Sequence, residues 1–493
     1  MYNKRMISIL TTVYNGYEFL EECARSIVVQ KCEHEGLRFS WEWWIGVNGH
    51  GESGGEALRI AEKIAQMDSR IRVVNLPDAK GRVAALNSLR AMVHGEWIAI
   101  IDCDDIWEQD KLITQMAAIK MANRPIGVVG TFCSYFGDVV STGPRLPPGW
   151  ISPENVLQAN PIINSSALIR ADLAHWENRF GLEDYDLWIR AIKGGHTLFN
   201  VPHPLVRHRI HKESAFNGKG GQDLRGLLEH HTGRPTVVTA YYPVPSKQNV
   251  TKYMEWITGF WPHMQCNLIF YTGPQLVETF QKLFKDRPNT IVVGVPFHSL
   301  TAFEKLSPFA WLDTQKLDTE NVGHTAELYA LWYEKKEFVA RAIISNPFFS
   351  NEFVWCDAGI GRYPEWNSKI QGFPARDFIP RGKMLVLEID PLQEHDWRPD
   401  EHGIRGEFTG RATFGGGILA SDINGWNRWS KAYDAMLARY LLAGRFIGKD
   451  QNIMASMILE QPDLALVVRR PQNMASTQRW FYLLFFLAGL CIS

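Results

Sequence analysis

The sequence predicts an α/β protein built from two domains, and three observations support this. Its 493 residues exceed what one ordinary hydrophobic core holds, so two domains of about 200–250 residues are expected. In the first third of the chain, apolar strand-like segments alternate with amphipathic helix-like segments, an order typical of a parallel, three-layered sheet. A second series of strand-like segments begins near Pro235, after the polar stretch LLEHHTGRP.

The individual elements follow from local hydrophobic patterns. In the first series we expect strands at 6–15, 41–49, 71–76 and 96–102, and helices at 16–32, 56–67 and 82–95. In the second we expect strands at 236–244, 266–274, 290–295 and 353–362, and a long helix at 325–343. We expect Lys335 and Lys336 to lie on a solvated face of that helix.

Composition excludes some classes of protein. A formal net charge of −1 argues against a nucleic-acid partner, because phosphate contacts need a basic surface. The seven cysteines are scattered and form no C-x-x-C pair, which is typical of reduced thiols in the cytosol. The first residues enter a strand-like segment at once and lack the long apolar region of a signal peptide. We therefore expect a cytoplasmic protein.

The C-terminal segment 479–493 differs in character from the rest of the chain. Trp480 to Ile492 are thirteen consecutive apolar residues. As a helix they would reach roughly 20 Å, less than the ~30 Å hydrocarbon core of a bilayer. Two interpretations of this segment stay open. It could be an interfacial anchor that gives peripheral membrane contact, or a helix docked on a partner or on the protein itself.

The stretch IAIIDCDDIW contains the most concentrated group of acids. Asp102, Asp104 and Asp105 directly follow an apolar strand. Two carboxylates one residue apart can converge on Mg²⁺ or Mn²⁺, which also takes phosphate oxygens. Helix caps and turns use the same residue types, so this pattern alone leaves both interpretations open.

Two later segments could complete such a site. Glu183 and Asp184 begin a predicted helix in GLEDYDLWIRAI, where they could cap the helix or act as a general base toward a sugar hydroxyl. RHRIHKES offers His208 and His211, either of which could be a metal ligand.

With these segments in order, residues 7 to about 218 resemble glycosyltransferase family 2, which has a GT-A fold. The resemblance rests on SILTTVYNGYEFLEECARSIVVQ, DAKGRVAALNSL, IAIIDCDDIW, EDYDLWIRA and RIHKES. It implies an inverting transferase that takes a nucleotide-diphosphate sugar, uses Mn²⁺ or Mg²⁺, and acts on a glycan or glycoconjugate acceptor.

The resemblance also implies residue roles. Asp102 would lie near the ribose and metal, Asp104 and His211 would bind the metal, and Asp184, with Glu183 beside it, would be the base. The residues implied around the nucleotide are Thr12, Tyr14, Asn48 and Lys80. One departure is that VNGHGES places Asn48 where the family usually has a carboxylate. Because an amide both donates and accepts, we expect base binding with an altered preference.

The second half offers sparser signals. Asp357 ends an apolar run in FVWCDAGIGR, Gly415 to Gly417 follow Phe414, and Asp450 begins a helix in GKDQNIM. Glycines let a ligand approach the backbone closely. The two aspartates could equally be turn or cap residues, and the glycines a plain loop.

Residues 236 to about 460 resemble the bacterial HtrL/YibB-like family, through TVVTAYYP, NLIFYTG, SNPFFSNEFVWCDAGIGR, FGGGI and GKDQNIM. That family is similar to GT-A transferases. The resemblance implies Asp357 at the metal or donor, Gly415 and Gly416 at the donor sugar, and Asp450 in catalysis. We therefore predict two GT-A-like domains in tandem, at 1–230 and 235–475, forming a bifunctional glycosyltransferase. The alternatives are one active N-terminal transferase with an acceptor-binding domain, and a non-catalytic glycan-binding scaffold.

Overall fold

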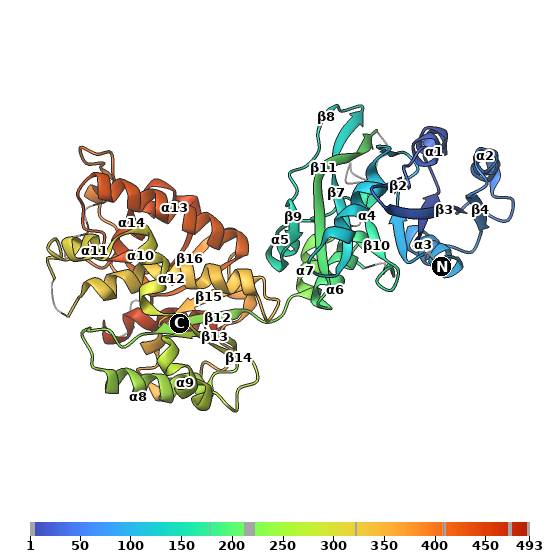
Figure 1. Cartoon of the computed structure of the whole chain (residues 1–493). Helices are drawn as coiled ribbons and strands as arrows, with labels where there is room; N and C mark the ends of the chain where they lie inside the picture. Colours follow the sequence, from blue (N-terminus) through green and yellow to red (C-terminus); the bar gives the residue numbers. More distant parts are fainter. Residues whose placement is uncertain are drawn as a thin grey trace. The chain divides into compact units, whose positions relative to one another are not determined.

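The computed structural model describes residues 5–177, 179–211, 222–320, 323–406, 408, 411–471 and 476–490. Residues 212–214 of the late segment RIHKES and residues 491–493 of the apolar tail lie outside these ranges. The chain divides into two compact units, Met1–His231 (unit 1) and Thr232–Ser493 (unit 2). Figure 1 colours unit 1 from blue to green and unit 2 from green to red. None of the helices in the described ranges is long and apolar enough to cross a membrane.

Unit 1 is a twisted sheet covered by helices. Its strands are β1 (Arg5–Val13), β2 (Glu33–His34), β3 (Leu37–Asn48), β4 (Ile71–Leu76), β5 (Trp97–Ile100), β6 (Ile106–Trp107), β7 (Ile126–Gly137), β8 (Ser141–Thr142), β9 (Gly149–Ile151), β10 (Leu168–Arg170) and β11 (Thr197–Ile210). Its helices are α1 (Leu20–Val28), α2 (Gly55–Ala65), α3 (Arg82–Met92), α4 (Lys111–Met121), α5 (Pro153–Gln158), α6 (Glu183–Lys193) and α7 (Leu224–His231).

The sheet of unit 1 is mixed, which corrects the expectation of a parallel sheet. Strands β4, β3, β1 and β5 are parallel neighbours in that order. Strand β10 then runs antiparallel to both β5 and β7, and β11 lies parallel to β7. The alternating strand and helix pattern covered only the first four of these strands, so the reversal at β10 was not visible in it.

Unit 2 has a second sheet. Its strands are β12 (Thr236–Tyr241), β13 (Asn267–Thr272), β14 (Thr290–Gly294), β15 (Glu352–Cys356), β16 (Met384–Glu388), β17 (Phe414–Asp422) and β18 (Ala465–Arg469). Its helices are α8 (Val250–Phe260), α9 (Val277–Leu283), α10 (Thr301–Lys305), α11 (Pro308–Gln315), α12 (Ala326–Ser345), α13 (Ile423–Leu442), α14 (Asp450–Glu460) and α15 (Tyr482–Leu487). Helices α8 and α9 cover one face of the sheet, and α12, α13 and α14 cover the other (Figure 1).

The main strands of the two sheets follow one order. In unit 2 the neighbours are β14, β13, β12, β15, β17, β16 and β18. The first four are parallel, β17 is antiparallel to β15 and β16, and β18 is parallel to β16. Unit 1 has the same sequence of directions along β4, β3, β1, β5, β10, β7 and β11. Among these seven main strands, the fourth along the chain is β5 in unit 1 and β15 in unit 2, and an acidic turn follows each.

The apolar tail is part of the core of unit 2. Phe481 and the buried side chains of α15 pack with Ile257 and Phe260 of α8, Trp366 and Phe373. Leu483, Leu484 and Leu487 are each at most 1% exposed. Of the two interpretations of the tail, the described residues therefore match a docked helix, and this helix docks on unit 2 itself.

Candidate active site

The acidic turn after β5 contains one structural carboxylate. Asp105 is fully buried, and its two oxygens lie 2.8 Å from the backbone nitrogen of Arg209 and 2.9 Å from Nδ1 of His208. Burial alone would disfavour a charged histidine, but the hydrogen bond and charge of Asp105 raise the pKa of His208 to about 9. Asp105 therefore links the turn to the end of β11 and holds the turn in shape.

The other two acids of the turn line a cavity. Asp102 forms an ion pair with Arg82, and its backbone nitrogen donates to Oγ of Ser165 at 3.1 Å. Oδ2 of Asp104 lies 3.0 Å from Nε2 of His211. Burial, followed by the charges of Asp105 and Asp102, raises the pKa of Asp104 to about 6, against the hydrogen bond from His211. The turn thus carries negative charge that its neighbours do not fully offset.

Helix α6 brings a second pair of acids to the same place. Oε1 of Glu183 lies 3.5 Å from Nε of Arg82, so this arginine joins the acids after β5 to those at the start of α6. Oδ2 of Asp184 accepts from Nδ2 of Asn160 at 3.0 Å. Burial and then Glu183 raise the pKa of Asp184, whereas the Asn160 hydrogen bond opposes this rise. A half-buried carboxylate with a raised pKa suits a general base.

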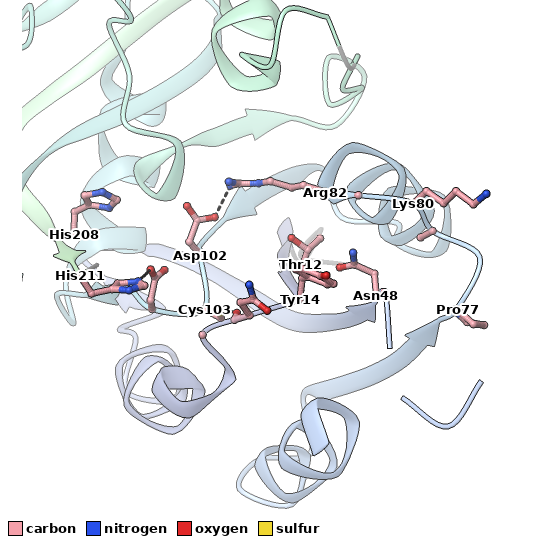
Figure 2. A pocket seen from close by; sticks show the side chains of 16 residues that line it. Thr12, Tyr14, Asn48, Pro77, Lys80, Arg82, Asp102, Cys103, His208 and His211 are labelled. Carbon is pink, nitrogen blue, oxygen red and sulfur yellow. Dashed lines mark hydrogen bonds and ion pairs between the residues drawn. The ribbon is translucent and has the colours of Figure 1, made fainter. Parts of the chain in front are cut away.

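Sequence reasoning missed Arg82. It occupies the first position of α3, just after Gly81, whose φ of 85° is in the left-handed region that favours glycine. Its position could have indicated a role, because Arg82 lies two residues after Lys80 in the segment DAKGRVAALNSL. Lys80, which we predicted at the nucleotide, lines the cavity, but its exposed side chain points away from Asp102 (Figure 2).

One cavity of about 550 Å³ collects most of the predicted unit 1 residues. Figure 2 shows Asp102 and the two histidines toward one end of it and Asn48, beside Thr12 and Tyr14, toward the other. The lining residues are Thr12, Tyr14, Asn15, Gly16, Asn48, Gly49, Pro77, Ala79, Lys80, Gly81, Arg82, Asp102, Cys103, Asp104, His208 and His211. Glu183 and Asp184 are not among them, but Glu183 pairs with Arg82, which lines the cavity.

Asn48 is the notable polar group at the far end of the cavity. It is the last residue of β3, it is 3% exposed, and its Oδ1 has no hydrogen-bond partner among the described residues. A buried acceptor without a partner is costly unless a ligand supplies a donor. Asn48 is therefore placed to receive a hydrogen bond from a molecule in the cavity.

Comparison with known proteins identifies this unit. Residues 8–170 match the family model described as "Glycosyl transferase family 2". Unit 1 carries a family 2 glycosyltransferase domain. The match covers β1 to β10, and therefore includes the acidic turn and Asn48 but ends before α6. The resemblance of unit 2 to the HtrL/YibB-like family stays a prediction.

Several relatives share the glycosyltransferase domain. A protein of Bacillus subtilis named as a teichuronic acid biosynthesis glycosyltransferase, TuaG, is 23% identical over 44% of this chain and 83% of its own length. An uncharacterized glycosyltransferase of Haemophilus influenzae is 25% identical over 43% of this chain and 67% of its own length. Both matches involve less than half of the chain.

Solved structures give weaker likenesses. The mannosyltransferase PcManGT from Pyrobaculum calidifontis, in complex with GDP-Man and Mn²⁺, has 17% identity and a TM-score of 0.33 over 43% of this chain. Staphylococcus aureus TarS, residues 1–349 with UDP-GlcNAc, has 13% identity and a TM-score of 0.36 over 44% of this chain. The chain covers 59% and 61% of these two structures.

Unit 2 brings its predicted acids together around a lysine. Nζ of Lys335, on α12, lies 2.8 Å from Oδ2 of Asp450 and 3.5 Å from Oδ1 of Asp357, and donates to the carbonyl of Gly416 at 2.9 Å. Nε1 of Trp355 also donates to Oδ1 of Asp357 at 2.8 Å. Burial raises the pKa of Asp357, whereas Lys335 and then Trp355 oppose this rise. Asp357 and Asp450, which are 93 residues apart in sequence, therefore form one site.

The expectation of a solvated lysine pair was wrong. Lys335 and Lys336 are 6% and 5% exposed. Lys335 is drawn inward by the two aspartates, and Lys336 pairs with Asp434 at 2.9 Å and with Glu337. A charge at a helical position facing two carboxylates, one of them buried, is stabilised inside, which helical spacing alone cannot reveal.

The glycines of unit 2 have a visible steric reason. A Cβ atom on Gly416 would lie 2.6 Å from Oδ2 of Asp450, so only glycine admits that carboxylate. Gly415 and Gly416 are buried, whereas Gly417 is partly exposed beside Asp357. That Gly415 and Gly416 border a donor sugar stays a prediction.

Proposed function

We propose that the protein transfers sugars from nucleotide-diphosphate sugars to a growing glycan, with unit 1 as an inverting, metal-dependent transferase and unit 2 as a second transferase. The observation that carries the unit 1 proposal is its cavity. A volume of about 550 Å³ suits a ligand of nucleotide-sugar size. An unpaired amide at one end could meet a base, while the acids at the other could meet a metal-bound diphosphate.

The proposed reaction in unit 1 uses Asp184 as the base. Its carboxylate takes the proton from an acceptor hydroxyl while that oxygen forms a bond to the anomeric carbon. The bond from this carbon to the diphosphate breaks on the opposite side, so the configuration inverts. Glu183 raises the proton affinity of Asp184, and Arg82 holds Glu183 and Asp102 in place.

Asp104, Asp102 and His211 are the candidate holders of Mn²⁺ or Mg²⁺. In the described ranges no three His, Cys, Asp or Glu side chains converge to hold a metal by themselves. The donor set still fits, because such cations are commonly bound by one or two carboxylates together with substrate phosphates. A bound cation would neutralise charge on the departing diphosphate.

Unit 2 is proposed as a second transferase because it repeats the strand order of unit 1 and places acids at matching points. Asp357 follows the fourth strand along the chain, as Asp102 does. Asp450 begins the helix before the seventh main strand, and Asp184 is the second residue of the corresponding helix in unit 1. We assign Asp357 to the donor and Asp450 to catalysis.

The test is a screen of the purified full chain against UDP-, GDP- and dTDP-sugars with glycan acceptors, measuring nucleotide release and product mass. Two transfers are expected, and Asp184→Asn and Asp450→Asn should each remove one. The exposed Asp138 provides the matched control Asp138→Asn. A single transfer that Asp450→Asn leaves intact would favour an acceptor-binding unit 2. No turnover, together with glycan binding, would favour a scaffold.

A further inference from the structure

The acidic turns of the two units share their first aspartate and differ at the next two positions. Unit 1 has Asp102-Cys103-Asp104, whereas unit 2 has Asp357-Ala358-Gly359. A Cβ atom on Gly359 would lie 2.9 Å from the ring of Tyr253 and 3.1 Å from the ring of Trp256, both on α8. The place that corresponds to Asp104 is therefore packed against aromatic rings and has no room for a metal-binding side chain.

The lysine of unit 2 is fully engaged by its neighbours. An ammonium group has three N–H donors, and that of Lys335 donates to Asp450 and to the carbonyl of Gly416 and forms an ion pair with Asp357 at 3.5 Å. Its side chain is 8% exposed, as is that of Asp450, whereas the side chain of Asp357 is 43% exposed. The fixed positive charge thus lies beneath an accessible carboxylate.

The charge balance of the two sites also differs. In unit 1, four acids lie near one arginine, which pairs with Asp102 and Glu183, for a formal charge of −3; the other two acids are Asp104 and Asp184. In unit 2, two aspartates share one lysine, for a formal charge of −1. A divalent cation would relieve the excess in unit 1, but in unit 2 it would meet an ammonium group in direct contact with both carboxylates.

We propose that unit 2 binds its nucleotide-diphosphate ligand without a divalent metal, and that Lys335 is the positioning residue that holds Asp357 and Asp450 and offsets part of their charge. This rests on the proposed function of unit 2 for the ligand class. It revises the prediction that Asp357 is a metal ligand. The donor site of unit 1 remains the one that needs Mn²⁺ or Mg²⁺.

The first test counts Mn²⁺ ions bound to the full chain by electron paramagnetic resonance, with no nucleotide and then with UDP, GDP or dTDP. Asp357→Asn and Asp450→Asn should leave both the count and the affinity unchanged. Asp104→Asn should weaken Mn²⁺ binding by at least about tenfold. An ion that disappears in Asp357→Asn, or in Asp450→Asn, would overturn the proposal.

The second test separates this proposal from the proposed function. Calorimetric titration of the Asp104→Asn variant with UDP, GDP and dTDP, in the presence of EDTA, should still show one nucleotide site, and Lys335→Met should weaken it. Binding that appears only after Mn²⁺ is added would overturn metal independence. If unit 2 bound no nucleotide under either condition, the second transferase would be contradicted, and the Mn²⁺ count would still decide whether Asp357 holds a metal.

Discussion

In unit 1 a partly exposed arginine at an open cavity pairs with two carboxylates and has two more nearby, whereas in unit 2 a buried lysine pairs with two carboxylates. The two units share their strand order and the positions of their acids. The basic side chain also comes from the same place, because Arg82 and Lys335 both lie on the helix between the third and fourth main strands along the chain. Similar sheets can thus carry sites that differ in charge and openness. The comparison shows that position in a fold identifies where chemistry can occur, while the neighbouring side chains decide which chemistry is available.

The largest expected effect separates the two proposed bases. Asp184→Asn should lower kcat of the unit 1 transfer by about 10²–10⁴-fold, because a neutral amide cannot take the acceptor proton. The unit 2 transfer should keep its rate, and Asp450→Asn should give the opposite result. Both rates are measured from product masses in one reaction. Equal loss of both transfers in either variant would mean that the units do not act independently.

The two bridging cations should differ in their effect on stability. Lys335→Met leaves the buried Asp450 without its ion pair and should destabilise unit 2 by about 3–5 kcal/mol. The matched Arg82→Met variant should destabilise unit 1 by less, because the side chains of Arg82 and Asp102 are 34% and 28% exposed. Urea unfolding followed by limited proteolysis of each unit measures both values. Equal losses of unfolding free energy in the two variants would show that the burial of Lys335 does not distinguish its ion pairs from those of Arg82.

The unpaired amide of unit 1 gives an intermediate effect. Asn48→Ala should weaken nucleotide binding to unit 1 by about 1 kcal/mol, or roughly fivefold to tenfold, because the ligand loses one hydrogen bond. Since Oδ1 of Asn48 has no partner in the protein, stability should change little. Calorimetry with UDP and GDP measures the loss, with Asn75→Ala as a control outside the cavity. Unchanged affinity for every nucleotide would show that the base does not meet Asn48.

The smallest expected effect is a shift in pH dependence. The Asn160 hydrogen bond favours ionised Asp184, so Asn160→Ala should raise the pKa of that carboxyl further. Because the base works when ionised, activity of unit 1 is lost as the pH falls through this pKa. The acid limb of kcat/KM should therefore move to higher pH by up to about one unit, given about 1 kcal/mol for the bond. A shift to lower pH would argue against Asp184 as the base.

Local patterns predicted some parts of the molecule well and others poorly. The strand predicted at 71–76 has the observed bounds of β4, and the helix predicted at 325–343 differs from α12 by one or two residues at each end. The reversal at β10 depends on pairing between segments distant in sequence, which no local period encodes. The acids of unit 1 were recognisable because three of them stand within four residues.

The bridging cations could not be recognised in the same way. Arg82 lies 20 residues before Asp102, and Lys335 lies 115 residues before Asp450. Lys335 occupies a helical stretch rich in charge, where exposure is the usual outcome. Only the folded arrangement shows that two carboxylates draw it inward.

Helix α15 has a consequence for the order in which the units can mature. The core of unit 2 includes Leu483, Leu484 and Leu487, so that core cannot close until these residues have left the ribosome. Unit 1 spans Met1–His231 and can complete its sheet while unit 2 is still being synthesised. The open, acidic site would then form first on each nascent chain, because the lysine-bridged site also needs Asp450.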